Sequence, residues 1–308
     1  MATTARLEVE NSDLLAALEA LSRKILACDD IGAILVPWRL PMKNMVMPTL
    51  LTDPDQLQGI DPLSPAFPMN SAKVVSRLTR KPSGSRVAAL LRPCEIRAFH
   101  ELVKLHQGSM EDLVIIGVDC LGAFSNRDYA RWVAETGQSA VETFYTRILD
   151  GKYTDDNGIK MAAACRSCEF PVAEGADISI GLYGVDTSSM LLLEARTDRG
   201  KTLQDKLHYP KTEAPTKRNK AVASIVAERM AARDDMVTAT REATDSLEKL
   251  AGYLAGCVNC YNCRVACPVC YCRECVFVTD VFDHDSVKYL RWAEKKGAVK
   301  MPTDTVLY

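Results

Sequence analysis

Apolar residues recur at two different spacings along the chain. Leu14, Leu18, Leu21 and Ile25 fall on one face of a helix that Asn11-Ser12-Asp13 can cap. Residues 31–36, 87–91 and 113–118 are instead short, almost continuous apolar runs, which are typical of strands buried inside a parallel sheet. Residues 95–106 return to the helical spacing between the last two runs. This order predicts a βαβ unit with parallel strands, and with it an α/β fold.

The remaining segments extend this prediction. Seven prolines between residues 37 and 68 end the first strand at Pro37 and favour loop and sheet-edge structure over helix. We expect helices over residues 69–81, 126–136 and 200–208, and a hairpin of two strands, 178–183 and 190–195, that turns at Gly184-Val185-Asp186. Residues 216–254 are rich in alanine and charge and hold no glycine before Gly252, which predicts one or two long helices forming an arm.

Cysteine positions point to metal chemistry. Twelve cysteines in a chain with a full hydrophobic core and no export signal favour metal ligation over disulfides. Cys94 and Cys120 directly follow two buried strands, so we expect both at the carboxyl edge of the sheet, where open α/β sheets bind ligands. Cys165 and Cys168 form a Cys-x2-Cys pair that can present two sulfurs to one metal centre. Taken alone, Cys94 and Cys120 also fit ordinary core cysteines, and Cys94 beside Glu95 also fits a nucleophile.

A second group of cysteines lies near the end of the chain. Cys257-x2-Cys260-x2-Cys263-x3-Cys267-Pro268 matches the bacterial ferredoxin run of a [4Fe–4S] cluster. Structural zinc sites usually have two separate cysteine pairs, so this continuous run favours iron–sulfur over zinc. Cys270, Cys272 and Cys275 follow without a second complete run. They either join a further cluster that has a non-cysteine or partner ligand, or they stay unligated.

Composition narrows the class of protein. The chain has 308 residues, of which 47% are hydrophobic and 25% charged, and its net charge is −2. This balance offers no electrostatic reason to bind nucleic acid or an anionic membrane. No apolar run reaches the roughly 18–20 residues that cross a bilayer, and the start lacks the basic and apolar segments of a signal peptide, so we expect a cytoplasmic protein.

Four segments, at residues 91–98, 117–120, 165–181 and 257–272, together resemble one family, the beta subunits of coenzyme F420-reducing hydrogenase and F420-linked formate dehydrogenase. Residues 91–98, LRPCEIRA, resemble its Pro-Cys-Gln/Glu motif, and residues 117–120, GVDC, resemble its next strand-end cysteine. Residues 165–181 resemble its Cys-x2-Cys segment with the following Ala-Asp-(Val/Ile)-Ser-x-Gly. Residues 257–272 are very similar to the ferredoxin-like extension of the formate dehydrogenase type.

The resemblance implies cofactors, site residues and partners. It implies that Cys94, Cys120, Cys165 and Cys168 hold one [4Fe–4S] cluster beside an FAD, which exchanges a hydride with coenzyme F420 and single electrons with the cluster. The C-terminal cysteines would hold one further cluster, or two: Cys257, Cys260, Cys263, Cys267, Cys270, Cys272 and Cys275. We expect the FAD at the carboxyl edge of the sheet, between a helix start with Asn70, Ser71 and Lys73 and a strand with Asp177 and Gly181. Partners would be a formate dehydrogenase or hydrogenase catalytic subunit, or a heterodisulfide-reductase-like flavoprotein, in a hetero-oligomer.

One departure from the family concerns the flavin. Where the family has a Gly-Gly turn that opens its first helix, this chain has Asn11-Ser12-Asp13, with Glu8 and Glu10 upstream. Carboxylates at a helix N-terminus suit the helix dipole but repel a pyrophosphate.

The leading hypothesis is therefore an electron-transferring flavin and iron–sulfur subunit of an anaerobic oxidoreductase complex. A flavin-less iron–sulfur relay subunit and a zinc-stabilised interaction protein are the alternatives. We expect an open, mostly parallel sheet with helices on both faces over residues 1–210, a helical arm over 211–254, a ferredoxin-like iron–sulfur module over 255–280 and a tail over 281–308.

Overall fold

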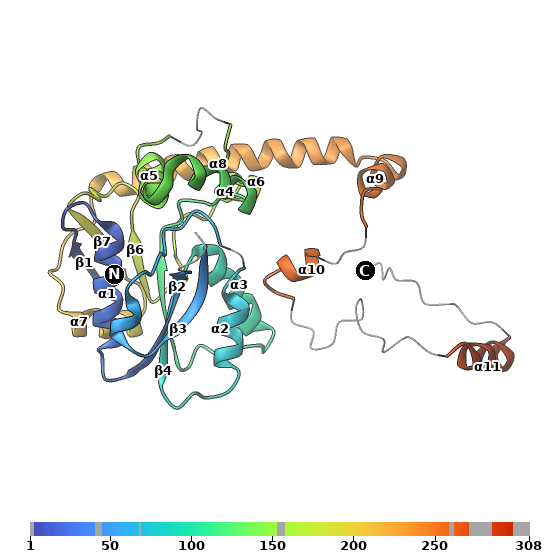
Figure 1. The fold of residues 1–308 in the computed structure, drawn as a ribbon, viewed down its shortest axis with the longest axis horizontal. Coiled ribbons are helices and arrows are strands. Elements are labelled where there is room, and N and C mark those ends of the chain that lie inside the picture. The colour runs from blue at the N-terminus through green and yellow to red at the C-terminus, as the bar shows by residue number, and fades with distance from the viewer. Residues whose placement is uncertain are drawn as a thin grey trace.

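The computed structural model describes residues 3–40, 45–67, 69–152, 158–258, 262–270 and 285–297 (Figure 1). Its centre is one sheet of seven strands in the order β1-β7-β6-β5-β4-β2-β3. The strands are β1 (Thr3–Glu8), β2 (Ile31–Arg39), β3 (Val46–Leu51), β4 (Arg86–Leu91), β5 (Leu113–Val118), β6 (Ile178–Gly181) and β7 (Met190–Ala195). Neighbours from β6 to β2 are parallel, and β7 and β3 are antiparallel to their neighbours, so five strands point the same way. The predicted open, mostly parallel sheet is confirmed.

Helices cover both faces of this sheet, as predicted. The helices of the body are α1 (Leu14–Leu26), α2 (Ala72–Thr79), α3 (Pro93–Lys104), α4 (Asn126–Thr136), α5 (Ala140–Leu149), α6 (Ala163–Arg166) and α7 (Asp198–Leu207), with short 3-10 turns at Pro54–Leu57 and Gly137–Ser139. Successive residues of a strand point to opposite faces. Accordingly Leu90 lies in the core under α1 and α7, whereas Leu91 lies in the core under α2 and α3.

The sheet departs from the prediction at one edge. The predicted end of a strand at Pro37 is wrong, because β2 continues to Arg39 and pairs with the edge strand β3. Pro37 stands directly opposite Pro48 in this pair, so the two missing N–H donors fall on one rung of the ladder. The pattern also predicted neither β1 nor α5. The backbone partner of β1 is β7, with Leu7 opposite Leu191, which is 184 positions further along the chain.

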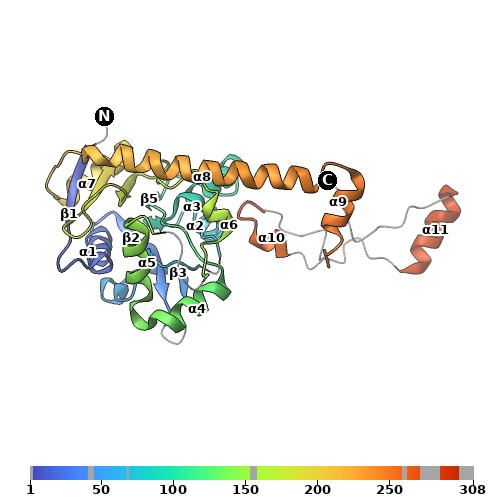
Figure 2. The same ribbon diagram turned by 90° about the horizontal axis from the view of Figure 1, so that it is seen from above.

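A long arm follows the body. It consists of α8 (Thr216–Ala243) and α9 (Leu247–Leu254), as the sequence predicted for residues 216–254. The helix α8 crosses the body and then projects beyond it (Figure 2). Its buried residues, Arg218, Ile225 and Arg229, all lie in its first half. These three residues share one face, so that face anchors the arm.

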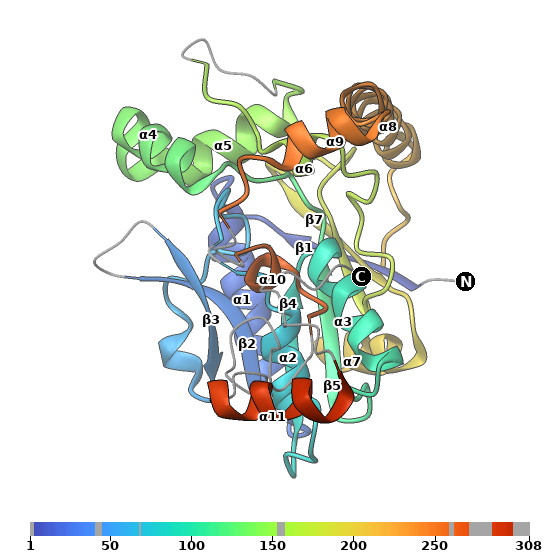
Figure 3. The ribbon, with the colours of Figure 1, turned by 90° about the vertical axis from the view of Figure 1, so that its right-hand side faces the viewer.

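Two short helices lie beyond the arm: α10 (Asn262–Ala266) and α11 (Ser286–Lys296). In Figure 3, α10 lies in front of α2 and α3. The Lys73 Nζ of α2 donates a hydrogen bond of 3.5 Å to the Arg264 carbonyl of α10, and Val269 packs against the core under α2 and α3. The segment that carries the ferredoxin-type run thus returns to the body. The division of the chain at residues 210, 254 and 280 stays a prediction.

Within the described ranges, every helix is too short or too polar to span a membrane.

Candidate functional site

Cys94 and Cys120 lie at the carboxyl edge of the sheet, as predicted. The strands β4 and β5 are paired in parallel, with Leu91 opposite Gly117, so both end at the same edge. Cys94 lies in the first turn of α3, directly after β4. Cys120 follows the end of β5 by two residues. The polypeptide therefore brings two thiols together from positions 26 residues apart in the sequence.

The Cys-x2-Cys pair is tied to the same edge. Cys165 lies in α6, and Cys168 follows it after a turn in which the Cys168 N–H donates to the Cys165 carbonyl at 3.4 Å. Backbone hydrogen bonds fasten this segment to the loop after β5: Cys120 N–H to Pro171 O at 2.7 Å, and Ala162 N–H to Ala123 O at 2.8 Å. All four cysteines are half-buried free thiols.

The four thiols are close enough to influence one another. Burial raises the pKa of the Cys94 thiol well above its ordinary value, and charges on Cys120 and Cys165 raise it further. Burial likewise raises the pKa of Cys120, with a further contribution from Cys168, and the pKa of Cys165, with contributions from Cys120 and Cys168. Thiolates at such a site need a compensating positive charge or hydrogen-bond donors.

Donors and cations are present around the sulfurs. The Gly122 N–H points to the sulfur of Cys120 and the Ala123 N–H to that of Cys165, and each lowers the pKa of its thiol against the effect of burial. The guanidinium of Arg92 also lowers the pKa of Cys94 and Cys120. The guanidinium of Arg229 lowers the pKa of Cys120 and Cys165. The environment thus favours thiolates once a metal group compensates for burial.

The spacing of the thiols bears on the kind of metal group. In the part of the chain that the structure describes, no three His, Cys, Asp or Glu side chains lie close enough to hold a single metal ion. A zinc ion needs its ligands about 2.3 Å from one centre. In a [4Fe–4S] cubane each cysteine binds a different iron, so the four sulfurs stand further apart. Four thiols are soft donors of the kind that hold iron–sulfur clusters or structural zinc, and ligation by them stays a prediction.

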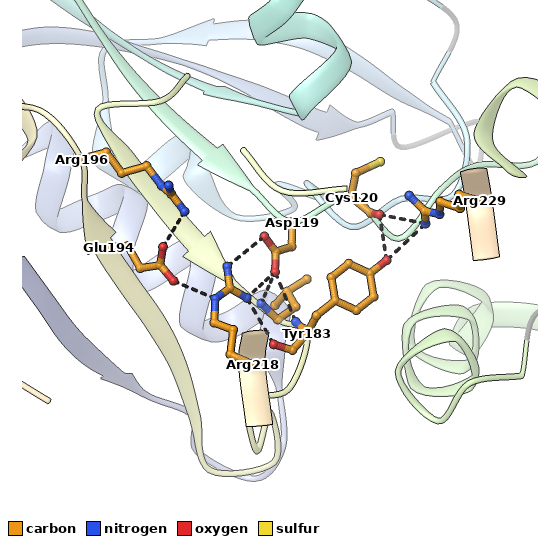
Figure 4. A network of polar contacts seen from close by, with 8 residues as sticks. Asp119, Cys120, Tyr183, Glu194, Arg196, Arg218 and Arg229 are labelled. Carbon is orange, nitrogen blue, oxygen red and sulfur yellow. Dashed lines mark hydrogen bonds and ion pairs between the residues drawn. The ribbon is translucent and has the colours of Figure 1, made fainter. Parts of the chain in front are cut away.

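Sequence reasoning missed a buried ion network beside Cys120 (Figure 4). The Asp119 carboxylate accepts hydrogen bonds from the Leu182 N–H and from Arg218 Nη1, both at 2.8 Å. Arg218 Nε also donates to Glu194 at 2.7 Å. The second arginine of α8, Arg229, donates to the Cys120 carbonyl at 3.3 Å and to the Tyr183 hydroxyl at 3.3 Å. The start of the arm is thus bonded to both residues that follow β5.

A second missed feature involves the glutamate of the Pro-Cys-Glu motif. Glu95 is 3% exposed, and its carboxylate accepts the N–H groups of Ser71 and Arg92, both at 2.9 Å. It therefore joins the start of α2 to the start of α3. Adjacency to Cys94 signalled this residue in the sequence, but its bond to Ser71 spans 24 positions and no local pattern encodes it.

The residues expected around a flavin have other partners. The Asn70 side chain accepts from the Ala72 N–H at 3.0 Å, and the Ser71 N–H is bonded to Glu95, so the start of α2 is already capped. The placement of Asp177 at the carboxyl edge is wrong. Asp177 precedes β6 at its amino end, where its carboxylate accepts from the Ile115 N–H at 2.8 Å and the Thr197 hydroxyl at 2.5 Å.

Gly181 does lie at the carboxyl end of β6, but Arg218 covers it: a Cβ there would stand 2.7 Å from the guanidinium carbon. Lys73 contacts the carbonyl of Arg264, as described above. Asp177 and Gly181 thus lie at opposite ends of β6, and flavin binding by these five residues stays a prediction.

A different pocket lies where the family has its Gly-Gly turn. Asn11 and Ser12 have φ angles of 52° and 59°, so two consecutive non-glycine residues adopt the left-handed conformation that glycine prefers. They border a pocket of about 420 Å³, a volume within the range of small-molecule sites. Asp13, Glu19 and Glu142 also line it, whereas its one arginine, Arg39, is paired with Asp61 at 2.8 Å. This charge pattern disfavours a pyrophosphate.

The C-terminal cysteines are only partly described. The Cys267 N–H donates to the Cys263 carbonyl at 2.9 Å, and the Cys270 N–H to the Cys267 carbonyl at 3.4 Å. Cys257 and Cys263 are exposed, and Cys267 and Cys270 are half-buried. Cys260, Cys272 and Cys275 lie outside the described residues. Ligation by this group stays a prediction.

Fold and site together define a class: an α/β protein with a cysteine cluster at the carboxyl edge of its sheet. Residues 84–217 match the family described as the C terminus of the coenzyme F420 hydrogenase/dehydrogenase beta subunit. The chain is therefore similar to this beta-subunit family over residues 84–217, and the resemblance noted in the sequence is confirmed. The matched region contains Cys94, Cys120, Cys165 and Cys168.

Two curated relatives carry related names. The chain is 27% identical to the F420-dependent formate dehydrogenase 1 subunit beta of Methanococcus maripaludis, over 66% of this chain and 59% of the relative. It is 24% identical to the F420-dependent formate dehydrogenase subunit beta of Methanocaldococcus jannaschii, over 85% of this chain and 70% of the relative. The fold is similar to a chain in the F420-reducing [NiFe] hydrogenase complex from Methanosarcina barkeri, with a TM-score of 0.55, 14% identity, and coverage of 80% of this chain and 94% of that chain.

Proposed function

We propose that this chain is an electron-transfer subunit of an oxidoreductase complex, with a [4Fe–4S] cluster on Cys94, Cys120, Cys165 and Cys168. The convergence of these four thiols at the carboxyl edge of the sheet carries the proposal. The beta-subunit family and the named relatives support the oxidoreductase class. The cluster would supply one-electron chemistry. The chain's own residues would hold it and direct two backbone N–H groups at its sulfurs.

The ferredoxin-type run supports a second centre. Cysteines 257–275 would hold at least one further [4Fe–4S] cluster, and the contacts of Arg264 and Val269 with the body keep that segment beside α2 and α3. Two clusters in one chain suit a relay, because each accepts and passes one electron at a time. The partner would be a formate dehydrogenase or hydrogenase catalytic subunit, or a heterodisulfide-reductase-like flavoprotein, in an anaerobic, cytoplasmic hetero-oligomer.

The source of the electrons decides what else the complex needs. Coenzyme F420 is the two-electron donor or acceptor that the relatives' names suggest. A hydride carries two electrons, whereas a cluster takes one, so a flavin must split the pair before a relay can use it. Since Asp177 and Gly181 lie at opposite ends of β6 and Arg218 covers Gly181, the geometry favours a relay that receives single electrons from a partner's flavin.

A flavin-bearing version of this function is the second candidate. The left-handed turn at Asn11-Ser12 and the pocket of about 420 Å³ beside it favour this version. The three carboxylates in the same pocket count against it. Flavin released by denaturing the anaerobically purified chain separates the two: about one flavin per chain supports the second candidate, and no flavin supports the relay.

The central cluster is tested by iron content. Replacing Cys94 or Cys120 by Ser should lower the iron content of the anaerobically purified protein by about four per chain, the content of one cubane. Cys28→Ser is the matched control, because Cys28 follows α1 and takes no part in the strand-end group. Unchanged iron in both variants would contradict the proposal. Zinc released in place of iron would favour an interaction protein.

A further inference from the structure

Arg92 and Arg229 are both buried beside the four cysteines. Arg92 is 5% exposed and Arg229 is 3% exposed. Arg92 donates to the Ser64 carbonyl at 2.9 Å, and its guanidinium lies 3.8 Å from the centre of the Phe67 ring. Arg229 donates to the Cys120 carbonyl and the Tyr183 hydroxyl. Every one of these partners is electrically neutral.

Among the described residues neither guanidinium forms an ion pair, although the charge of Arg92 lowers the pKa of the buried Asp61 carboxyl. Among the residues of known placement, no carboxylate oxygen lies within 4.0 Å of a nitrogen of either guanidinium. The neighbouring Arg218 is a buried arginine whose charge is compensated in the usual way. It is 4% exposed and bonded to two carboxylates, Asp119 and Glu194. An arginine does not lose its proton in a protein, and a buried charge without compensation is strongly destabilising. Arg92 has compensation from Asp61, which is already paired with Arg39 at 2.8 Å, so an anion beside the cysteines would stabilise both arginines.

Cys120 is the cysteine that both arginines approach. Arg92 and Cys120 line the same small pocket, and Arg229 donates to the Cys120 carbonyl at 3.3 Å, so both guanidiniums lie beside the cysteine loop. The two arginines come from different elements: Arg92 precedes α3, and Arg229 lies on α8. They therefore approach the cysteines from separate parts of the fold.

We propose that Arg92 and Arg229 form a cationic frame that compensates a thiolate-bound cluster and raises its reduction potential. This inference rests on the proposed function of the four cysteines. One-electron reduction adds a negative charge to an already anionic group, and a buried cation nearby stabilises the reduced form more than the oxidised form. Net charge and hydrogen bonding around the sulfurs are established determinants of cluster potential.

The test is a redox titration that is followed by electron paramagnetic resonance. It uses the full chain in a Cys263→Ser/Cys267→Ser background, so that the central cluster alone contributes to the signal. Arg229→Gln removes the charge but keeps a side chain that can donate to the Cys120 carbonyl, whereas Arg229→Lys keeps the charge. Arg92→Gln and Arg92→Lys form an independent pair. Arg241→Gln, at an exposed position of the same helix α8, is the control.

Each Gln variant should lower the midpoint potential. At a fixed potential the ratio of reduced to oxidised cluster should fall at least tenfold, which is about 59 mV for a one-electron couple. The Lys variants and Arg241→Gln should stay close to the parent. Cluster loss in a Gln variant but not in the matching Lys variant would also support the frame.

An unchanged midpoint in both Gln variants at full iron content would overturn the inference, as would cluster loss in the Lys and Gln variants alike. Failure of the proposed function looks different: the parent itself would then contain no iron that depends on Cys94 and Cys120.

Discussion

Arg218 and Asp119, which are 99 positions apart in the chain, form a buried ion pair of 2.8 Å. Their side chains are 5% and 0% exposed. The pair joins the first turn of the arm helix α8 to the residue that precedes Cys120. Glu194 of β7 adds a second carboxylate to the same guanidinium at 2.7 Å, so the arm, the sheet and the cysteine loop meet at one residue.

Removal of Arg218 should strongly destabilise the protein. Arg218→Met leaves Asp119 buried without its cation, and loss of one partner of a buried pair costs about 3–5 kcal/mol. The measurement is the urea midpoint of anaerobically purified protein. Lys249→Met is the control, because its pair with Asp245 has half-exposed partners and should change stability by about 0–1 kcal/mol. Equal midpoints for the two variants would mean that the buried pair does not anchor the arm.

Acid should remove a stabilising contribution of Asp30. Asp30 binds Lys206 at 2.7 Å and Arg86 at 2.6 Å, and the hydrogen bond from Lys206 lowers the pKa of its carboxyl. A carboxyl whose pKa is lower in the folded state stabilises the fold at pH values above its ordinary pKa, about 3.9 for Asp. This stabilisation is lost as the pH falls through the pKa of the folded state. The difference in unfolding free energy between the parent and Asp30→Asn should stay constant near neutral pH and shrink towards acid.

The exposed neighbour Asp29 provides the control for this titration. Asp29 forms no ion pair with any residue that the structure describes, so Asp29→Asn should leave the pH profile unchanged. A difference between the parent and Asp30→Asn that grows towards acid would contradict the sign of the effect.

A methyl group at Gly122 should damage the cysteine site. Gly122 has a φ of 100°, and a Cβ there would stand 2.3 Å from the sulfur of Met161. Gly122→Ala should therefore cost about 1–3 kcal/mol in backbone strain alone, and the shift of the Gly122 N–H from Cys120 should lower the iron content. Gly252→Ala is the control, since a Cβ in α9 meets open space and alanine favours a helix. Normal iron content in Gly122→Ala would show that the loop adapts without harm to the site.

The two cysteine groups should lose iron independently. Cys263→Ser should lower the iron content by about four per chain, the content of one cubane, while the signal of the central cluster remains. Combined with Cys94→Ser, the losses should add, because the two groups lie on different elements. If Cys263→Ser had no effect on iron, the ferredoxin-type run would not ligate a cluster in this chain.

Local patterns were sufficient for much of the fold. The apolar run of residues 113–118 coincides with β5, and the helical spacing of residues 126–136 coincides with α4, because burial on two faces and burial on one face leave different periodicities in the sequence. The rule that parallel strands end at one edge also placed Cys94 and Cys120 together from the sequence alone.

Partners that are distant in the chain could be assigned only from the tertiary structure. The pairing of β1 with β7 and of Pro37 with Pro48 depends on strand neighbours, which no local periodicity specifies. Likewise Arg218 and Arg229 are two of the four arginines of α8, and their burial follows from where that helix crosses the body.

Asp177 is a residue that the sequence motif placed differently from the tertiary structure. Its sequence motif placed it near a flavin, whereas the fold puts it at the amino end of β6 and satisfies its carboxylate with Ile115 and Thr197. Composition, spacing and strand order determined which residues could ligate a metal group, because these properties are local. Charge compensation and access to the site were decided by tertiary contacts, because a buried side chain interacts with whatever the fold brings beside it.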